Sequence, residues 1–414
     1  MAFKKVILAI FIVLFSSKHI YSQSTLTVCQ NCSFKSINEA INKAKAHDTI
    51  YIKQGVYKEN NILIKKPMVI RGENDTTIDI EKKGYGFIIK SDSVHLYNVH
   101  VTNVGQSYTK DFAAIYISKS NHFSVKKVTL DKVFFGILIE KSHHGFIENN
   151  TVSSNALNEA AAGNGIHMWY CSNITVKQNE LHHLRDGIYF EFVTHSTVVN
   201  NYSHDNIRYG LHFMFSNHDE YHYNTFTKNG AGVAVMFSKF IKMTHNTFLE
   251  NWGAASYGLL LKEIYDAEII NNRIEQNTTG INVEGSTRVH YSRNNFVRNG
   301  WAVKISGACY TNIFKENNFL NNSFDVSYNS NLNDNSFDNN YWSDYSGYDL
   351  DKNGLGDVPY RPVKLFSYVV NKTPETIVLL RSLFVDIINF SEKVSPIFTP
   401  DDLMDVHPKM KKIQ

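Results

Sequence analysis

Histidine and methionine recur together in the middle of the chain, in short segments of similar pattern. Nine of the eighteen histidines lie between His167 and His245, and His212 precedes Met214 by two residues. Imidazole nitrogens and thioether sulfurs together favour a soft metal, above all Cu(I). We therefore expect a Cu(I) site formed by His167, His212, Met214 and Met236. The alternative is that the methionines only pack beneath neighbouring loops and that the histidines are solvated.

A second set of candidate metal ligands lies near the C-terminus. Oxygen-bearing side chains there follow the spacing of the first half of a calcium-binding loop, at Asp349, Asp351, Asn353 and Asp357. Gly354 stands where such a loop turns sharply, whereas Tyr360 replaces the glutamate that usually completes it. We expect either a structural calcium site that ties the last repeat to the C-terminal tail, or an ordinary surface turn rich in Asp and Gly.

Two cysteines close to the N-terminus, Cys29 and Cys32, form a C-x-x-C motif. In an exported protein such a pair most simply forms a small disulfide that pins the N-terminus. A redox-active or metal-binding thiol pair is the alternative, although no thioredoxin-like pattern surrounds the motif.

The first 22 residues have the pattern of a secretory signal peptide. Lys4 and Lys5 precede an apolar run that extends from Val6 to Phe15, and the small residue Ser22 marks a plausible cleavage site. The run is shorter than the roughly 20 apolar residues that span a bilayer. The mature protein is therefore expected to be exported and soluble.

The charge balance argues against a nucleic-acid partner. The 42 Lys and Arg residues and the 39 Asp and Glu residues give a net charge of +3 and are interspersed along the chain. Binding to phosphates requires a concentrated basic surface, which this distribution does not predict. We expect no nucleic-acid partner.

The elements that must position these side chains form a repeat. A small residue followed by alternating branched residues recurs at intervals of about two dozen residues, starting at Gly136, Gly165, Gly187, Gly210, Gly232, Gly258, Gly280 and Ala302. A second signature, Asn-x-apolar, recurs later in each repeat, at Asn150, Asn179, Asn200, Asn224, Asn246, Asn272, Asn294, Asn317 and Asn335. Short alternating strands at a fixed period predict an all-β, right-handed parallel β-helix with inward asparagine ladders at its turns.

Strand alternation predicts which side chains of the repeat face outward. The column that contains His167 and His212 also contains Tyr189, and the parallel column contains Met214 and Met236. We expect an exposed binding face on which these residues are joined by Trp169, Tyr189, Glu191 and Lys262. Three insertions, near residues 106–111, 154–164 and 251–256, enter at the same turn and should form a rim above this face.

Helical patterns at both ends predict covers for the solenoid. Ser36 and Glu39 form a capping box at the start of a short amphipathic helix, and the residues between Pro374 and Phe390 have helical spacing. The second helix either caps the last coil near Phe337 and Trp342 or docks on a partner. The chain divides into a signal peptide (1–22), an N-terminal cap with the first coils (23–84), β-helix repeats (85–342), an Asp/Gly-rich loop region (343–372) and a helical tail (373–414).

Several segments of the chain resemble the NosD family, the periplasmic maturation factors of nitrous oxide reductase. The similar strings are GIHMW (165–169), RDGIYFEF (185–192), RYGLHFMF (208–215), GAGVAVMF (230–237), YGLLLKE (257–263), YDLD (348–351) and DVPYRP (357–362). The resemblance covers nearly the whole mature chain. Its strings are more specific than the general β-helix pattern that pectin lyases share.

The resemblance implies a role in copper delivery. NosD proteins work with an ATP-binding-cassette ATPase and its membrane permease, support assembly of the copper–sulfide cluster of nitrous oxide reductase, and act with copper from a lipoprotein chaperone. It does not identify the copper ligands, so the ligand prediction rests on spacing alone.

A carbohydrate-active protein is the competing functional class, because the same fold carries polysaccharide lyases and epimerases. Such enzymes need clustered acids with a base. On the predicted face, Glu191 lies between Trp169 and Met214, and Glu284 is paired with Lys262. We therefore expect no enzymatic activity, and a scaffold that binds no metal is the third class.

Overall fold

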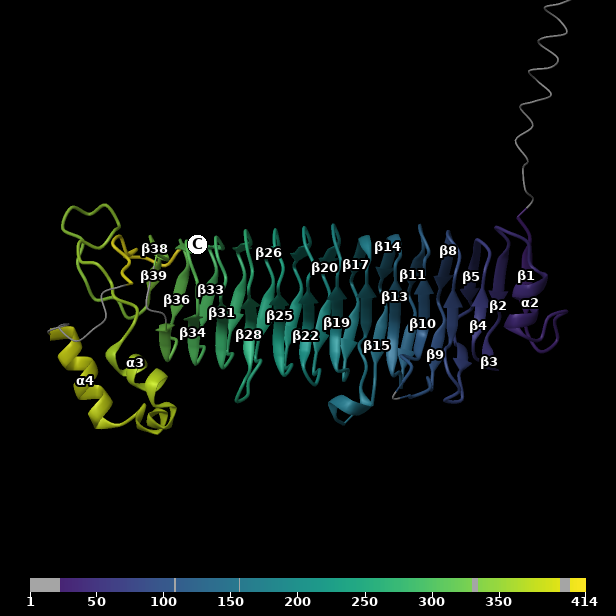
Figure 1. Cartoon of the computed structure of the whole chain (residues 1–414), viewed down its shortest axis with the longest axis horizontal. Helices are drawn as coiled ribbons and strands as arrows, with labels where there is room; N and C mark the ends of the chain where they lie inside the picture. The colour runs from purple at the N-terminus through teal and green to yellow at the C-terminus, as the bar shows by residue number, and fades with distance from the viewer. Residues whose placement is uncertain (1–22, 108, 156, 330–333, 395–402) are drawn as a thin grey trace, which may run out of the picture.

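The chain forms a long rod of stacked parallel strands (Figure 1). The computed structural model describes residues 23–414, except 108, 156, 330–333 and 395–402, so the predicted signal peptide lies outside the described residues. Three parallel sheets run along the rod, and each coil contributes one short strand to each sheet. This is the right-handed parallel β-helix that the repeat predicts.

The 12-stranded sheet carries the predicted His/Met face. Each strand pairs in parallel with its equivalents in the coils before and after it. Its strands are β4 (Ile62–Ile64), β7 (Phe87–Ile89), β10 (Ala113–Ser118), β13 (Phe135–Glu140), β16 (Ile166–Trp169), β19 (Asp186–Glu191), β22 (Tyr209–Met214), β25 (Ala231–Met236), β28 (Tyr257–Lys262), β31 (Thr279–Glu284), β34 (Trp301–Ser306) and β37 (Phe324–Asn329).

The 14-stranded sheet follows the 12-stranded sheet within each coil. Its strands are β1 (Thr25–Val28), β2 (Thr49–Ile52), β5 (Met68–Gly72), β8 (Val94–Tyr97), β11 (Ser124–Lys126), β14 (His143–Glu148), β17 (Ser172–Lys177), β20 (Thr197–Val199), β23 (Glu220–His222), β26 (Lys242–Thr244), β29 (Glu268–Ile270), β32 (His290–Ser292), β35 (Ile313–Lys315) and β38 (Ser336–Asp338).

The 13-stranded sheet completes each coil. Its strands are β3 (Gly55–Lys58), β6 (Thr76–Asp79), β9 (His100–Thr102), β12 (Thr129–Asp131), β15 (Thr151–Ser153), β18 (Glu180–His182), β21 (Tyr202–His204), β24 (Thr225–Thr227), β27 (Thr247–Leu249), β30 (Arg273–Glu275), β33 (Asn295–Val297), β36 (Asn318–Leu320) and β39 (Tyr341–Trp342).

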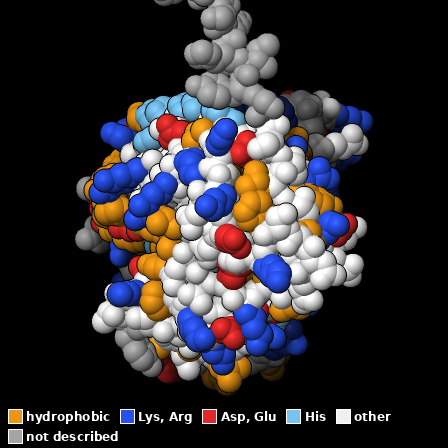
Figure 2. Space-filling model, turned by 90° about the vertical axis from the view of Figure 1, so that its right-hand side faces the viewer, with side chains coloured by type: hydrophobic (Ala, Val, Ile, Leu, Met, Phe, Trp, Pro, Cys, Tyr) orange, Lys and Arg blue, Asp and Glu red, His pale blue; other side chains and the backbone are white. Residues whose placement is uncertain are grey.

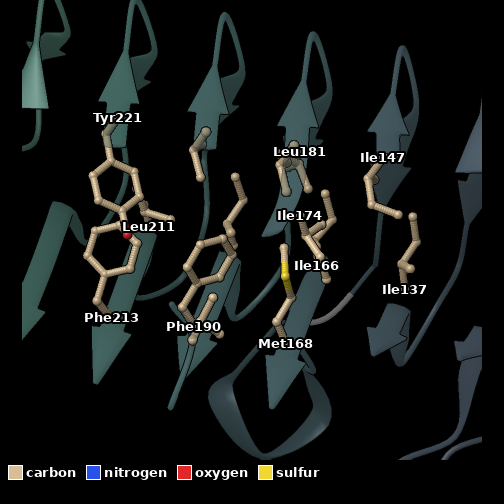
Figure 3. Close-up of a cluster of buried hydrophobic side chains, with 14 of the residues drawn as sticks. Ile137, Ile147, Ile166, Met168, Ile174, Leu181, Phe190, Leu211, Phe213 and Tyr221 are labelled. Atoms are coloured by element: carbon tan, nitrogen blue, oxygen red, sulfur yellow. The ribbon is translucent and has the colours of Figure 1, made fainter. Parts of the chain in front are cut away.

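Alternate strand residues point into the rod and form one continuous apolar core. Ile137 and Ile166 stack in adjacent coils, and the Phe213 and Tyr221 rings meet across the core with centroids 4.0 Å apart (Figure 3). A single coil cannot bury these side chains alone, because burial requires the coils on either side. Each fully buried Ile, Leu or Phe contributes about 1.5–3 kcal/mol to the stability of the stack.

Asparagine ladders run along the core, but one of them differs from the prediction at two places. The observed ladder contains Asn201 instead of Asn200 and ends at Asn340, whereas Asn335 pairs with Asn312 in a separate ladder. The left-handed residue is the one before each ladder asparagine, as at Asn200 with φ 55°. That residue turns its side chain to solvent and leaves the next asparagine to point inward.

The N-terminal end is closed by the short helix α2 (Ile37–Lys43), as predicted. Ser36 caps it by accepting the Glu39 N–H at 3.4 Å, and the Glu59 carboxylate accepts the N–H of Ile37 at 2.6 Å. Cys29 and Cys32 are joined by a disulfide next to this cap, which confirms the simpler interpretation of the motif.

The C-terminal end differs from the single helix predicted between Pro374 and Phe390. The tail contains α3 (Leu365–Lys372), the 3-10 helix η2 (Pro374–Leu379) and α4 (Leu383–Val394). Proline cannot supply the N–H that would continue α3, so a new helical segment begins at Pro374. A further 3-10 helix, η1 (Glu159–Ala161), lies in one of the insertions.

The tail helices pack on the last coil at its 12-stranded sheet, away from the predicted Phe337 and Trp342. Phe366 of α3 lies against Phe324 of β37 and in one cluster with Trp301 of the preceding coil. The last coil is covered by the C-terminal segment, in which Asp405 accepts the indole N–H of Trp342 at 3.0 Å. No helix among the described residues is long and apolar enough to cross a membrane.

Candidate functional site on the outer face of the 12-stranded sheet

Strand register places the predicted site residues in two parallel columns. His167, Tyr189 and His212 are Cα partners in β16, β19 and β22. The second column continues from Met214 to Met236, and it also contains Trp169, Glu191 and Lys262. The structure therefore brings the predicted copper ligands to one face of four consecutive coils, those of β16, β19, β22 and β25.

The first column is largely covered, which corrects the expectation of an exposed patch. His212 is buried with 5% of its surface exposed, whereas His167 and both methionines are half-buried. The rings of Tyr189 and Tyr209 lie 4.9 and 4.8 Å from the His212 ring and cover it. Leu138, Ala234 and Leu260 in the same column are buried as well, so the burial is a feature of this column and not of His212 alone.

Beside His212 lies a buried polar cluster, which we define as Asn164, His167, Arg185, Asp186 and His212. Five buried side-chain atoms without a hydrogen-bond partner in the protein gather in it: Asn164 Oδ1, Arg185 Nε, Asp186 Oδ2, His212 Nδ1 and His212 Nε2. An unpaired buried polar atom costs about 1–3 kcal/mol. Such a concentration in one place makes the cluster a candidate ligand-binding site, because a ligand or bound water can satisfy these atoms together.

The electrostatics of the buried polar cluster keep an imidazole available for a metal. Burial, followed by the nearby Arg185 guanidinium, lowers the pKa of His167 to about 4. A neutral imidazole keeps a nitrogen lone pair at pH 7. Asp186 Oδ2 lies 3.6 Å from His212 Nδ1 and 3.9 Å from Arg185 Nε. At these distances the carboxylate makes no hydrogen bond to the His212 ring, so both ring nitrogens remain free for a ligand.

Sequence reasoning missed Asp186, although a signal for it exists. Asp186 occupies the strand position that holds Phe135, Tyr209 and Trp301 in other coils. Alignment of the repeats shows an acidic residue where other coils have an aromatic one, and this exception could have singled out Asp186.

The methionine pair, Met214 and Met236, adjoins the buried polar cluster. Met214 lies two residues after His212 on β22, on the same face of the strand. The Tyr189 hydroxyl contacts Met214 Sδ at 3.5 Å. Burial, and then the nearby Glu191 carboxylate, raises the pKa of Tyr189 to about 12, so its hydroxyl stays protonated. Soft sulfur atoms and unpaired imidazole nitrogens thus lie within two adjacent coils.

The aromatic residues of this face do not form an open stacking platform. Lys141 Nζ lies over the Trp169 ring at 5.0 Å, and the Tyr170 ring packs edge-on against it at 4.7 Å. The Tyr189 ring is flanked by His167, with centroids 4.6 Å apart, and by His212. A sugar ring needs a free aromatic face, and these neighbours reduce the aromatic surface that is free for it.

The insertions lie where the sequence predicted them, between the 13-stranded and 12-stranded sheets. The Gln106 amide donates to Ala161 O at 2.8 Å and joins two of them. Glu159 of η1 lies 3.8 Å from Arg208 Nε, close to the strand that carries His212. A cavity of about 760 Å³ opens between the first two insertions, lined in part by Lys82, Phe134 and Leu157. The insertions therefore form a rim beside the site.

The predicted calcium loop closes on itself through its own oxygen atoms. Asp349 accepts the N–H groups of Asn353 at 3.1 Å and Gly354 at 2.9 Å. Asp351 accepts the Asn353 amide at 2.8 Å, and Asp357 accepts the Leu350 N–H at 2.7 Å. Gly354 has φ 85°, a backbone conformation that glycine adopts readily.

The methionine pair is the source of soft metal ligands on this face. No three His, Cys, Asp or Glu side chains in the described part of the chain already converge on a metal position. The two cysteines outside the disulfide, Cys171 and Cys309, are buried, and burial raises the pKa of Cys171 to about 12. Thioether sulfur is therefore the soft ligand that this face offers.

Solved structures with a similar fold have varied functions. The chain is similar to PfbA, a surface adhesin of Streptococcus pneumoniae, with 12% identity, a TM-score of 0.55, and coverage of 75% of this chain and 87% of that one. It is also similar to a mutant of the PL6 family alginate lyase AlyGC, with 14% identity, a TM-score of 0.61, and coverage of 77% and 51%. These likenesses show the β-helix fold alone.

Sequence relatives are more informative. Residues 153–347 match the family model described as "Periplasmic copper-binding protein (NosD)". Two curated relatives carry the name "Probable ABC transporter binding protein NosD". One, from Pseudomonas aeruginosa, is 25% identical over 370 residues, 85% of this chain and 86% of its own. The other, from Stutzerimonas stutzeri, is 24% identical over 373 residues, 85% of each. The matched region contains the whole of the face described above, and the chain is similar in sequence to the NosD family of periplasmic copper-binding proteins.

Proposed function

We propose that this protein carries Cu(I) on the outer face of the 12-stranded sheet and supports copper delivery during the maturation of nitrous oxide reductase. His212, Met214 and Met236 are the proposed ligands, and His167 assists from the preceding side. Copper is the cargo rather than a resident cofactor. The observation that carries the proposal is the position of His212, whose ring nitrogens lack a hydrogen-bond partner in the protein, two residues from the methionine pair.

Cu(I) fits this ligand set better than Zn(II) or Ca(II). Thioether sulfur and neutral imidazole are soft or intermediate ligands that suit Cu(I), whereas Ca(II) needs several oxygen ligands. The half-buried methionines lie at the edge of the site, and His212 lies deeper. Copper can therefore enter and leave through the sulfur side, as a carrier requires.

The proposed partners are an ABC-type permease with its ATPase, nitrous oxide reductase, and a lipoprotein chaperone that supplies copper. The name shared by the two curated relatives supports the first of these partners. Apolar side chains of α4 remain uncovered, with Leu383 74% and Phe390 69% exposed. Uncovered apolar surface of this kind marks interfaces. We propose that this surface of α4 docks on the periplasmic side of the permease.

The test is Cu(I) binding measured by competition with a chromophoric Cu(I) chelator. The variant Met214→Leu with Met236→Leu keeps side-chain volume and removes both sulfur atoms. We expect weaker binding in this variant, because it loses two soft ligands. The control, Met404→Leu with Met410→Leu, removes two thioethers from the C-terminal segment and should bind as the wild type does. Equal affinity in the wild type and the Met214/Met236 variant would exclude this ligand set.

The alternative function is that of a glycan lyase or epimerase, and the arrangement of acids favours copper delivery over it. Glu140 accepts a hydrogen bond from Tyr116 at 2.6 Å, and Glu284 accepts one from Asn282 at 2.7 Å. Glu191 has Trp169 and Met214 as its partners in the adjacent coils. We expect no unsaturated products and no new reducing ends from pectate or alginate. Turnover that disappears in Glu191→Gln or Glu284→Gln would instead establish an enzyme.

A further inference from the structure

A cavity of about 760 Å³ lies in the coils that precede the His/Met face, where the chain passes from the 13-stranded to the 12-stranded sheet. The first two insertions wall it, with Gln106 from one and Asn155, Leu157 and Asn158 from the other. Its volume falls within the range of about 300–1,000 Å³ that is usual for ligand pockets. None of its described lining residues is a proposed Cu(I) ligand, so the cavity is a separate candidate site.

Strand register sets four polar side chains of the cavity in one column. Asn103 and Lys132 directly follow the paired strands β9 and β12, and Ser154 follows β15 in the next coil. The Lys82 N–H donates to Asn103 O at 2.8 Å, which places Lys82 in the coil before. Adjacent strands lie about 4.8 Å apart, so the backbone positions of Lys82 and Lys132 are about 10 Å apart. At this spacing the two ammonium groups suit two carboxylates better than one.

The two lysines give the cavity a positive charge. Both are exposed, and neither forms an ion pair with an acid in the part of the chain that the structure describes. None of the described lining residues is an acid. Asp79, which does not line the cavity, offsets part of the charge. Its carboxylate accepts the Asn103 amide at 2.9 Å, and this hydrogen bond, more than the charge of Lys132, lowers the pKa of Asp79.

The cavity differs in this respect from the neighbouring end of the rod. On the end that carries α2, basic and acidic side chains are interspersed (Figure 2). Interspersed charges of both signs do not attract a polyanion as one surface. Recognition of an anion therefore requires a local site such as the cavity.

Neutral polar side chains of the cavity offer both donors and acceptors. The Asn103 amide nitrogen donates to Asp79, which leaves the side-chain oxygen of Asn103 for a ligand. The Gln106 amide nitrogen likewise donates to Ala161 O at 2.8 Å. Asn158 has the opposite arrangement, because its side-chain oxygen accepts the Ala161 N–H at 3.0 Å and its nitrogen is left. Hydroxyl groups of a ligand both donate and accept, so they can use both kinds of group.

Apolar side chains complete the lining. Val104 and Val133 are buried. Phe134 is half-buried, and its ring packs edge-on against Phe135 with centroids 5.1 Å apart. Leu157 is exposed on the opposite wall. An apolar lining with a few polar groups that fix orientation is usual in ligand pockets.

We propose that this cavity binds an acidic oligosaccharide whose carboxylates pair with Lys82 and Lys132. The sugar hydroxyls bond to the amides of the two insertions, and the C–H face of a sugar ring packs on Phe134 and Leu157. A fatty acid or an aromatic acid uses the lysines and the apolar side chains but leaves the amides unused, whereas an acidic sugar uses all three. The cavity binds such a chain without cleaving it, because hydrolysis needs clustered acids and its described lining contains none.

The test is isothermal titration calorimetry of the full chain with trigalacturonate. We expect binding that weakens as salt is added, and no binding of maltotriose, a neutral sugar of the same length. The variant Lys82→Gln with Lys132→Gln should bind about 5–30-fold more weakly, because it loses two exposed ion pairs with the ligand. The control, Lys119→Gln with Lys141→Gln, removes two exposed lysines from left-handed positions of adjacent coils at another turn, with φ 52° and 47°, and should bind as the wild type does.

Four outcomes would overturn the proposal. Equal affinity for maltotriose would show that the lysines do not select the ligand, and so would unchanged affinity in the Lys82/Lys132 variant. An equal loss in the Lys119/Lys141 control would indicate a general charge effect. Tighter binding of decanoate than of trigalacturonate would assign the cavity to an amphipathic acid.

The oligosaccharide site is independent of the proposed copper function. The Met214→Leu/Met236→Leu variant should bind trigalacturonate as the wild type does, whether or not it loses Cu(I). Removal of an exposed amide in Asn155→Ala should weaken trigalacturonate binding and leave Cu(I) affinity unchanged.

Discussion

Replacing Asn201, but not Asn200, should strongly destabilise the protein. Asn201 Nδ2 donates to Val176 O at 3.0 Å, Val199 O at 3.1 Å and Asn224 Oδ1 at 3.0 Å. Its Oδ1 accepts the backbone N–H of Asn179 at 2.9 Å and the Asn179 amide at the same distance. In Asn201→Ala, the Asn179 N–H is left buried without a partner.

The magnitude follows from these contacts. One orphaned buried donor costs about 1–3 kcal/mol and each of the four other lost bonds about 0.5–1.5 kcal/mol, which gives a total of about 3–9 kcal/mol. Unfolding entropy of about 2.1 cal/mol/K per residue over roughly 390 residues converts this loss to a decrease of about 4–11 °C in melting temperature. Asn200 is exposed, and Asn200→Ala changes only a residue in the left-handed backbone conformation of a turn. We therefore expect the melting temperature to fall by only about 1 °C.

The assay is a thermal melt of both variants and the wild type, followed by circular dichroism at one scan rate. Urea titration provides a second measure, provided that the slope of the transition is unchanged. Equal decreases for the two variants, or a larger one for Asn200→Ala, would refute the ladder assignment and the reasoning from buried hydrogen bonds.

Three further predictions follow from other parts of the chain. Burial, and then Asp344, raises the pKa of Asp325 to about 7, above an unfolded value of about 3.9. The stabilising contribution of Asp325 is therefore complete below about pH 4 and is lost as the pH rises through about 7, by up to about 4 kcal/mol. The urea midpoint of the wild type should fall with pH over this range, and that of Asp325→Asn should not. The same pH dependence in both proteins would contradict the prediction. If the predicted loop binds calcium, Ca(II) should raise the melting temperature of the wild type but not that of Asp349→Ala. A wild-type melting temperature that Ca(II) does not change would show that the loop is an ordinary surface turn. Phe384→Asp with Ile387→Asp should fold but lose co-purification with the permease, and the exposed control Val56→Asp should retain it; retention by the α4 variant would exclude docking through this helix.

The repeat allows the fold and the register of the site to be predicted from sequence. Apolar alternation and the glycine before each strand recur at one period, so the sequence alone aligns His167, Tyr189 and His212 in one column. The same regularity places the insertions at one turn. Periodic features are predictable because every coil must satisfy the same stacking constraint.

Features that depend on non-periodic packing could not be predicted in the same way. The Tyr189 and Tyr209 rings lie against His212, and the sequence does not specify their orientation. The choice between Asn200 and Asn201 depends on which residue adopts the left-handed turn. The tail helices follow contacts of Phe366 with distant residues, Trp301 and Phe324, rather than the helical pattern alone.

X-ray absorption at the copper edge tests the central claim most directly. Spectra of the wild type loaded with one equivalent of Cu(I) should contain sulfur scatterers at about 2.3 Å together with a nitrogen shell at about 2.0 Å, by analogy with bond lengths at other metal centres. The sulfur shell should disappear in Met214→Leu with Met236→Leu and persist in Met404→Leu with Met410→Leu. A first shell of nitrogen and oxygen alone in the wild type would contradict copper carriage by the His/Met face.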